Sequence, residues 1–193
     1  MHIIIAGTAR AGKTTLSLML KEMGYVHYKM DSIKRGICEA YKLEYDNWEK
    51  VSPIMATIIN RMIKDNKTDT NYQLENYIID IPFLYPKDVN LIDTKDTLVI
   101  YLGYAKLTPS ESFNKIRKHD KENYWTYNLT DDKLMSWCQD NIEFSKYIEK
   151  ECKKYRFKYF DTSCNRDKVL QDIVHYIKLK EHEYCLLNKE ISN

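Results

Sequence analysis

The residues with the clearest chemical pattern lie near the start of the chain, where the segment GTARAGKT occupies positions 7 to 14 directly after the apolar run HIIIA. This segment fits the spacing G-x-x-x-x-G-K-[ST]. In a loop of this kind the backbone N–H groups surround phosphate oxygens, the lysine reaches the β- and γ-phosphates, and the hydroxyl residue holds Mg²⁺. The sequence therefore predicts a binding site for a nucleoside triphosphate, ATP, with Mg²⁺.

Most residues of this segment, and Thr15 directly after it, have an expected role. Lys13 contacts the β- and γ-phosphates and acts in catalysis, and Thr14 is a ligand of Mg²⁺. The other residues of the nucleotide-binding set surround the phosphates or begin the helix beside them, namely Gly7, Ala9, Arg10, Ala11, Gly12 and Thr15. Because the chain has only five glycines, a chance match to this spacing is rare.

Two aspartates follow other strand-like segments. Asp80 lies in the apolar run YIIDI, and we predict that it binds Mg²⁺ together with Thr14 and borders the substrate. Asp31 follows the run YVHYKM and is a candidate catalytic residue that accepts the proton of a substrate hydroxyl. Arg35, one helical turn later, would hold an anionic group of the same substrate. A turn at Asp80, a helix cap at Asp31 and a solvated surface position for Arg35 are the structural alternatives.

A basic and aromatic stretch, FNKIRKHDKENYW at positions 113 to 125, supplies a further candidate. Cations that close over a transferring phosphoryl group stabilise the charge spread over its oxygens, and a helical flap can bring them there. We predict this catalytic role for Arg117, with Lys115, Lys118 and Lys121 as weaker candidates. The alternative is a solvated helix face.

The elements that must position these residues alternate between strands and helices. Strands are predicted at 2–5, 25–30, 77–81, 97–102 and 156–162, and the first has the uniform β-branched composition of a strand buried on both faces. Apolar residues spaced i, i+3, i+4, i+7 predict one helix from Leu16 to Met23 and a closing helix from Leu170 to Ile177.

Three further helices are predicted from start signals and apolar spacing. The first carries Ile33 to Tyr41. The second has Pro53 in its first turn and continues through Met62, and the third runs from Thr130 to about Cys152. The polar segment 64–71 is predicted to be an exposed connection.

This order predicts an α/β fold, a three-layer doubly wound parallel sheet of five strands. Ligands of such sheets bind beyond the carboxyl ends of the strands, where Gly7, Asp31, Asp80 and Asp161 are expected to meet.

Length and composition limit the functional classes. A chain of 193 residues is expected to form one domain, 1–193, with a lid-like insertion at about 108–128. No apolar run is long enough to cross a membrane and the N-terminus lacks the features of an export signal, so we expect no membrane contact and a cytoplasmic location. A net charge of +2 is too small to indicate a nucleic-acid partner. The five cysteines have no C-x-x-C spacing and are expected to be buried or inert thiols.

Taken together, the motifs resemble the adenylate kinase-like group of P-loop nucleoside and nucleotide kinases and related small-molecule phosphotransferases. GTARAGKT resembles the phosphate loop, MDSIKRG the segment that holds the acceptor, and YIIDIPF the third-strand segment with its aspartate. Residues 113–125 resemble the lid, and YFDTSCNRDKVLQDIVHYI resembles the last strand and helix, whose intervening loop borders adenine. The resemblance covers nearly the whole chain. It implies a P-loop NTPase fold with a helical lid.

The activity that the resemblance implies is that of a kinase. It would transfer the γ-phosphoryl group of ATP, with Mg²⁺, to a small hydroxylated or phosphorylated metabolite, a nucleoside or a nucleotide.

The chain departs from adenylate kinases in the third-strand segment. Those enzymes usually read D-G-[FY]-P-R, whereas Ile81 replaces the glycine here and Leu84 stands near the place of the arginine that would hold a nucleoside monophosphate. This departure argues against AMP as the acceptor. It predicts an acceptor pocket that is apolar or aromatic on the side of residues 82–85, and it favours a nucleoside or another hydroxylated metabolite.

Three other functions are compatible with parts of the pattern. The segment NKTD, 66–69, imitates the guanine-binding N-K-x-D of GTPases, but it precedes the metal-binding strand and DIPF lacks the glycine of a D-x-x-G switch. A nucleotide-binding regulatory NTPase without an acceptor would carry the same phosphate loop. A nucleic-acid end kinase would use the basic residues 113–121, although the small net charge argues against it.

Overall fold

A five-stranded parallel sheet forms the centre of the molecule in the computed structural model, which describes residues 1–44, 47–68, 76–82 and 84–191. The strand order is β2-β3-β1-β4-β5 and all four pairings are parallel. The strands are β1 (His2–Gly7), β2 (Val26–Lys29), β3 (Tyr77–Asp80), β4 (Thr97–Gly103) and β5 (Lys158–Asp161). The predicted α/β class and five-stranded parallel sheet are therefore confirmed.

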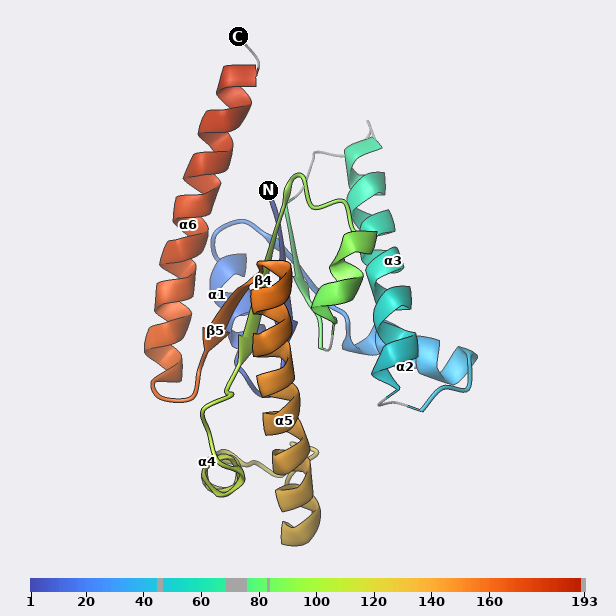
Figure 1. Ribbon diagram of the computed structural model, residues 1–193, viewed down its shortest axis with the longest axis vertical. Helices are drawn as coiled ribbons and strands as arrows, with labels where there is room; N and C mark the ends of the chain where they lie inside the picture. Colours follow the sequence, from blue (N-terminus) through green and yellow to red (C-terminus); the bar gives the residue numbers. More distant parts are fainter. Residues whose placement is uncertain (45–46, 69–75, 83, 192–193) are drawn as a thin grey trace.

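Helices cover both faces of this sheet, which gives the three predicted layers (Figure 1). On one face, Ile3 and Ile5 of β1 pack with α1 (Lys13–Lys21) and α6 (Arg166–Ile191). On the other, Ile4 and Ala6 pack with residues of α3 (Trp48–Thr68), η1 (Pro86–Leu91) and α5 (Asp131–Tyr155). Burial on both faces explains the uninterrupted β-branched run of β1. The two remaining helices are α2 (Asp31–Ala40), which follows β2, and α4 (Pro109–His119), which follows β4.

The region around α3 differs from its prediction in two ways. The helix begins at Trp48, so Pro53 lies inside it and not in its first turn. The helix also continues to Thr68, so the predicted connection is wrong for residues 64–68, which are helical, although Lys64 and Asp65 are exposed as expected. Residues 69–71 lie outside the described residues. Tertiary contacts account for the extension, because Ile63 is fully buried and the Tyr77 hydroxyl donates a 2.8 Å hydrogen bond to Asn66 Oδ1.

Helix α4, which lies within segment 108–128, and helix α5, which follows it, both begin with a threonine cap. Thr108 and Glu111 form a reciprocal capping box at the start of α4. Thr130 accepts a hydrogen bond from the Lys133 N–H at the start of α5, as the sequence predicts. Ile116 of α4 packs with Leu134 and Cys138 of α5 in a small separate core. Segment 108–128 is therefore fastened to the first turns of α5.

Two further findings concern composition. None of the helices in the described ranges is long and apolar enough to cross a membrane. All five cysteines are free thiols; Cys38, Cys138 and Cys152 are buried, whereas Cys164 and Cys185 are exposed.

Candidate active site

The loop between β1 and α1 has a conformation that only glycine allows at its ends. Gly7 has φ +120°, and a Cβ there would overlap the backbone carbonyl of Leu102 in the neighbouring strand. Gly12 has φ +102° and precedes the first residue of α1. Between them, Arg10 adopts a left-handed φ of 63°. These three positions curve the backbone around the N-terminus of α1.

The amides of this loop are largely unpaired. Thr8 N–H donates to Leu102 O at 2.9 Å and Ala11 N–H donates to Thr8 O at 3.3 Å. Within the described ranges, the N–H groups of Ala9, Arg10 and Gly12 donate to no other group. The first N–H groups of α1 also lack intrahelical acceptors and form the positive end of the helix dipole. Several donors are thus available to one anion, as phosphate binding requires.

The side chain of Lys13 lies within this loop. It is 7% exposed, and its ammonium donates a 2.8 Å hydrogen bond to the Thr8 carbonyl. Burial lowers the pKa of Lys13, and the negative charges of Asp80 and Asp31 oppose that effect. The structure therefore brings the lysine and both candidate aspartates into one electrostatic neighbourhood.

Thr14 and Asp80 are in direct contact. The Thr14 hydroxyl donates a 2.6 Å hydrogen bond to Asp80 Oδ2, and Asp80 is 1% exposed. His27 Nε2 lies 3.8 Å from the same carboxylate oxygen. A hydroxyl and a buried carboxylate are oxygen ligands of the kind that Mg²⁺ accepts together with phosphate oxygens, so these residues beside the β1–α1 loop fit the predicted metal.

Asp31 lies near Lys13 of this site, whereas Arg35 is an exposed residue of the same helix. Met30 N–H donates to Asp80 O at 2.9 Å, which holds the start of α2 beside the end of β3. Asp31 Oδ2 lies 3.9 Å from Lys29 Nζ. The Arg35 side chain is exposed and has neither an ion pair nor a hydrogen bond within the described part of the chain.

The expectation that residues 82–85 line an acceptor pocket does not hold for Leu84. Leu84 is fully buried in the core beside α3 and η1. Tyr85 packs against Phe144 and Tyr147 of α5, and its N–H donates to the Ser52 hydroxyl. The apolar side chains at 84 and 85 are used to pack this turn onto α3 and α5. Phe83 lies outside the described residues.

A cavity of about 670 Å³ adjoins the loop. Three segments that are distant in sequence line it: the loop itself, segment 104–124, and the connection between β5 and α6. The lining includes Arg10, Tyr104, Lys115, Tyr124, Asn165 and Arg166. Both α4 and the β5–α6 connection thus border a space large enough for a nucleoside beside the β1–α1 loop.

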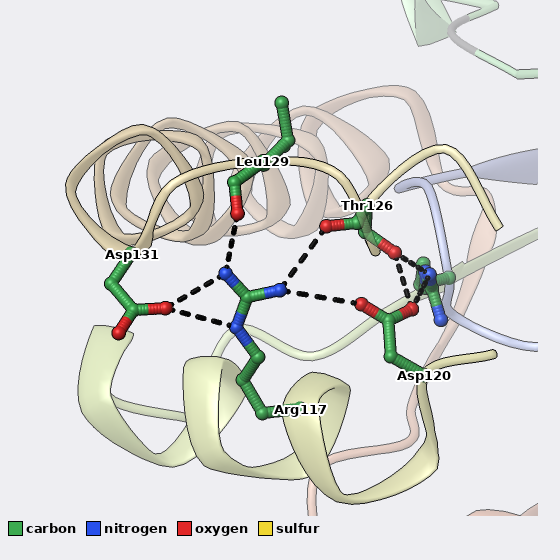
Figure 2. Close-up of polar contacts among 6 residues, drawn as sticks. Arg117, Asp120, Thr126, Leu129 and Asp131 are labelled. Carbon is green, nitrogen blue, oxygen red and sulfur yellow. Dashed lines mark hydrogen bonds and ion pairs between the residues drawn. The ribbon is translucent and has the colours of Figure 1, made fainter. Parts of the chain in front are cut away.

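Arg117 does not line this cavity, contrary to the role predicted for it. Figure 2 shows its guanidinium within segment 117–131. Nε and Nη2 donate to Asp131 Oδ1 at 3.1 and 2.8 Å, Nη2 donates to Leu129 O at 2.7 Å, and Nη1 donates to Thr126 O at 3.3 Å. These contacts fold the connection between α4 and α5 onto α4. The donors expected for a phosphoryl group are therefore used to hold this segment together.

Arg10 instead connects the loop to this segment. Its Nη2 donates to Asp120 Oδ1 at 2.9 Å and to the Thr126 hydroxyl. The guanidinium carbon lies 5.0 Å from the centre of the Tyr124 ring. Nothing in the sequence distinguishes Asp120 and Thr126 from their polar neighbours, because the contact spans 110 positions.

The described part of the segment NKTD, residues 66–68, belongs to the last turn of α3. Asn66 is helical and its side-chain oxygen accepts the Tyr77 hydroxyl, while Asp69 lies outside the described residues. The described part of this segment is used for packing α3 against β3.

Comparisons with known proteins show the fold. No protein-family model and no curated protein matches the chain, but solved structures do. A shikimate kinase from Bacteroides thetaiotaomicron has a TM-score of 0.58 and 14% identity, covering 92% of this chain and 98% of that chain. A gluconokinase from Sinorhizobium meliloti has a TM-score of 0.58 and 12% identity, covering 96% of both chains. A sugar kinase from a Janibacter species has a TM-score of 0.54 and 11% identity, covering 92% and 94%. The chain has the fold of P-loop small-molecule kinases over nearly its whole length.

Proposed function

We propose that this protein is an ATP- and Mg²⁺-dependent kinase that transfers the γ-phosphoryl group to a hydroxyl of a small metabolite. One observation carries the proposal: unpaired loop amides, the Lys13 ammonium and the Thr14–Asp80 pair come together at the carboxyl ends of β1 and β3. Phosphoryl transfer depends on positioning and on charge stabilisation, which are what this set of groups supplies. The fold, shared with kinases of small molecules, supports it further.

In this proposal the loop residues bind the donor. The amides of Ala9, Arg10 and Gly12 surround the phosphates, and Lys13 leaves the Thr8 carbonyl to contact the β- and γ-phosphates. The nucleoside occupies the adjoining cavity. Mg²⁺, when bound with the nucleotide, neutralises phosphate charge, and Thr14 and Asp80 are the residues that would hold it.

Asp31 acts on the acceptor. The acceptor oxygen forms a bond to the γ-phosphorus, the bond between that phosphorus and the bridging oxygen breaks, and ADP leaves. Asp31 takes the proton of the attacking hydroxyl. Arg35, one turn later on α2, is available for an anionic group of the acceptor.

Two observations support our choice of acceptor class: the solved structures that share the fold, and the third-strand segment. The relatives are named for shikimate, gluconate and sugar as substrates, all of them hydroxylated small molecules. Leu84, near the place where adenylate kinases carry an arginine, is a core residue and provides no contact for a nucleoside monophosphate. We therefore favour a polyhydroxylated metabolite or a nucleoside as the acceptor. We also propose that the reaction takes place in the cytoplasm.

The test is a screen for acceptor-dependent ADP release. Purified protein is incubated with Mg·ATP, or with Mg·GTP, and with panels of sugars, hydroxy acids, nucleosides and nucleotides. We expect one class to raise ADP release above the basal rate, and the Lys13→Ala variant to lose that increase. Tight Mg·ATP binding without turnover of any acceptor would favour a regulatory NTPase. Lack of binding would refute the proposal.

A further inference from the structure

Asp120 holds a buried carboxylate between two arginines from different parts of the fold. It lies at the end of α4, and its side chain is 3% exposed. Oδ1 accepts hydrogen bonds from Arg10 Nη2 at 2.9 Å and from the Thr126 hydroxyl at 2.5 Å. Oδ2 accepts no hydrogen bond from any described residue and lies 3.7 Å from Arg117 Nη1 (Figure 2). One carboxylate thus connects the phosphate loop to the α4–α5 connection.

The contact uses only part of the Arg10 guanidinium. An arginine has five N–H donors, and only those on Nη2 are engaged by Asp120 and Thr126. Nε and Nη1 donate to no other group among the residues that the structure describes, and Arg10 lines the cavity beside the loop. Arg10 can therefore keep the carboxylate on one side and bind an anion with its remaining donors.

We propose that Asp120 is a positioning residue that acts through Arg10. It orients the guanidinium so that the remaining donors contact the terminal phosphate of a bound nucleoside triphosphate. The same contact attaches the α4–α5 connection to the loop. The inference rests on the proposed function, since it requires a triphosphate in the loop. Arg10 then has the role that the sequence predicted for Arg117, and Arg117 supports Asp120 from the opposite side.

Physical chemistry favours this arrangement over an arginine that is free in solvent. A long side chain loses rotamer freedom when it is fixed, and Asp120, Thr126 and the Tyr124 ring fix it before the nucleotide arrives. A charge-assisted hydrogen bond to a buried carboxylate is stronger than a neutral one and is little screened by salt. An asparagine at position 120 would keep an acceptor oxygen and lose the charge that holds the guanidinium.

Calorimetric titration of four proteins tests the inference. Wild type, Asp120→Asn, Arg10→Ala and the double variant are each titrated with the magnesium complex of the non-hydrolysable ATP analogue AMPPNP and with Mg·ADP. We expect Asp120→Asn to weaken Mg·AMPPNP binding about tenfold and Mg·ADP binding less than about threefold. In the Arg10→Ala background, Asp120→Asn should cause no further loss, because its effect passes through Arg10.

Asp131→Asn is the matched control. It makes the same change in the same segment and removes a partner of Arg117, but Asp131 does not contact Arg10. We expect both affinities to stay within about twofold of wild type. Thermal unfolding of every variant checks that it folds. If Asp120→Asn does not fold, Asp120→Glu replaces it in the test, because it keeps the negative charge but displaces it. This variant should selectively weaken the binding of Mg·AMPPNP.

Three outcomes overturn the inference: losses that add in the double variant, equal losses for the two nucleotides, or tighter binding by Asp120→Asn. The last would mean that Asp120 competes with the nucleotide for Arg10. If wild type binds neither nucleotide, the inference and the proposed function both fail. If the coupling is found but no acceptor is phosphorylated, the inference stands and the kinase assignment fails.

Discussion

The Thr14 hydroxyl donates a 2.6 Å hydrogen bond to Asp80 although the two residues are 66 positions apart. Parallel pairing of β1 with β3 places Asp80 opposite Ile5, so the carboxylate lies at the strand end from which the phosphate loop departs. The first turn of α1 then brings Thr14 to it. The relationship joins the two residues that the sequence analysis assigned to the same Mg²⁺ ion.

Replacing Asp80 tests this pair. We expect Asp80→Asn to reduce phosphoryl transfer about 100-fold, because the variant loses the only charged group of the proposed metal ligands, while metal-free nucleotide binding changes little. The measurement is turnover against Mg²⁺ concentration. Asp88→Asn is the control, since Asp88 accepts a 2.5 Å hydrogen bond from Ser52 outside the site. An unchanged Mg²⁺ dependence in Asp80→Asn would exclude Asp80 as a ligand.

The lowered pKa of Lys13 predicts that nucleotide binding depends on pH. Burial lowers its pKa from 10.5, and a bound triphosphate would stabilise the ammonium, so binding should take up a proton and weaken as pH rises through the lowered pKa. Calorimetry at pH 7 and pH 9, in buffers of different ionisation enthalpy, measures the uptake. Lys13→Ala should abolish both the uptake and phosphoryl transfer.

The same pKa shift has the opposite effect on the nucleotide-free protein. The unfolded chain keeps the Lys13 proton up to about pH 10.5, whereas the folded protein releases it earlier. The contribution of Lys13 to stability therefore rises with pH between the two pKa values. Wild type should gain stability relative to Lys13→Ala in that interval, and equal pH profiles of the two proteins would contradict the burial of the ammonium.

Gly7 is expected to tolerate no side chain. Gly7→Ala should lose at least about 2 kcal/mol of unfolding free energy, because its Cβ would overlap the Leu102 backbone at a φ unfavourable for alanine. Gly36→Ala is the matched control: Gly36 is exposed within α2 and has open space around it, so alanine should stabilise the helix by about 0.5 to 1 kcal/mol. Urea unfolding measures both, and equal effects would contradict the close approach of β1 and β4.

Two exposed cysteines allow nucleotide binding to be located. Cys164 lines the cavity, whereas Cys185 lies near the end of α6. We expect saturating Mg·ATP to slow alkylation of Cys164 by iodoacetamide at least about fivefold, because the ligand covers the thiol, and to leave Cys185 unchanged. Mass spectrometry of peptides distinguishes the two sites. Equal protection of both cysteines, or of neither, would refute the proposal that the nucleoside binds in this cavity.

Asp31 is expected to affect transfer and not donor binding. Asp31→Asn should lower kcat about 100-fold through loss of the proton acceptor, with the Mg·ATP dissociation constant nearly unchanged. Glu39→Gln makes an equivalent change at an exposed position on the same helix and should have no effect. If kcat in Asp31→Asn stays at the wild-type value, Asp31 has no part in the chemistry.

The conformation of the loop between β1 and α1 could be predicted from sequence because it depends on neighbours in the chain. Gly7 and Gly12 adopt positive φ within a few residues of each other, and Lys13 and Thr14 follow in the first turn of α1. The burial of β1 on both faces was equally visible, since an apolar run without alternation fits only an interior strand. Strand, loop and helix therefore followed from local composition.

Tertiary structure alone decided which partners the long polar side chains take and where contacts extend a helix. Arg10 belongs to the glycine-rich motif and Arg117 to the lid-like segment. Arg10 contacts Asp120 across 110 positions, whereas Arg117 donates to carbonyls within its own segment. Leu84 is a core residue because α3 and η1 surround it. Backbone torsions depend on adjacent residues, whereas the partner of a flexible charged side chain depends on which distant groups the packed core brings within hydrogen-bonding distance.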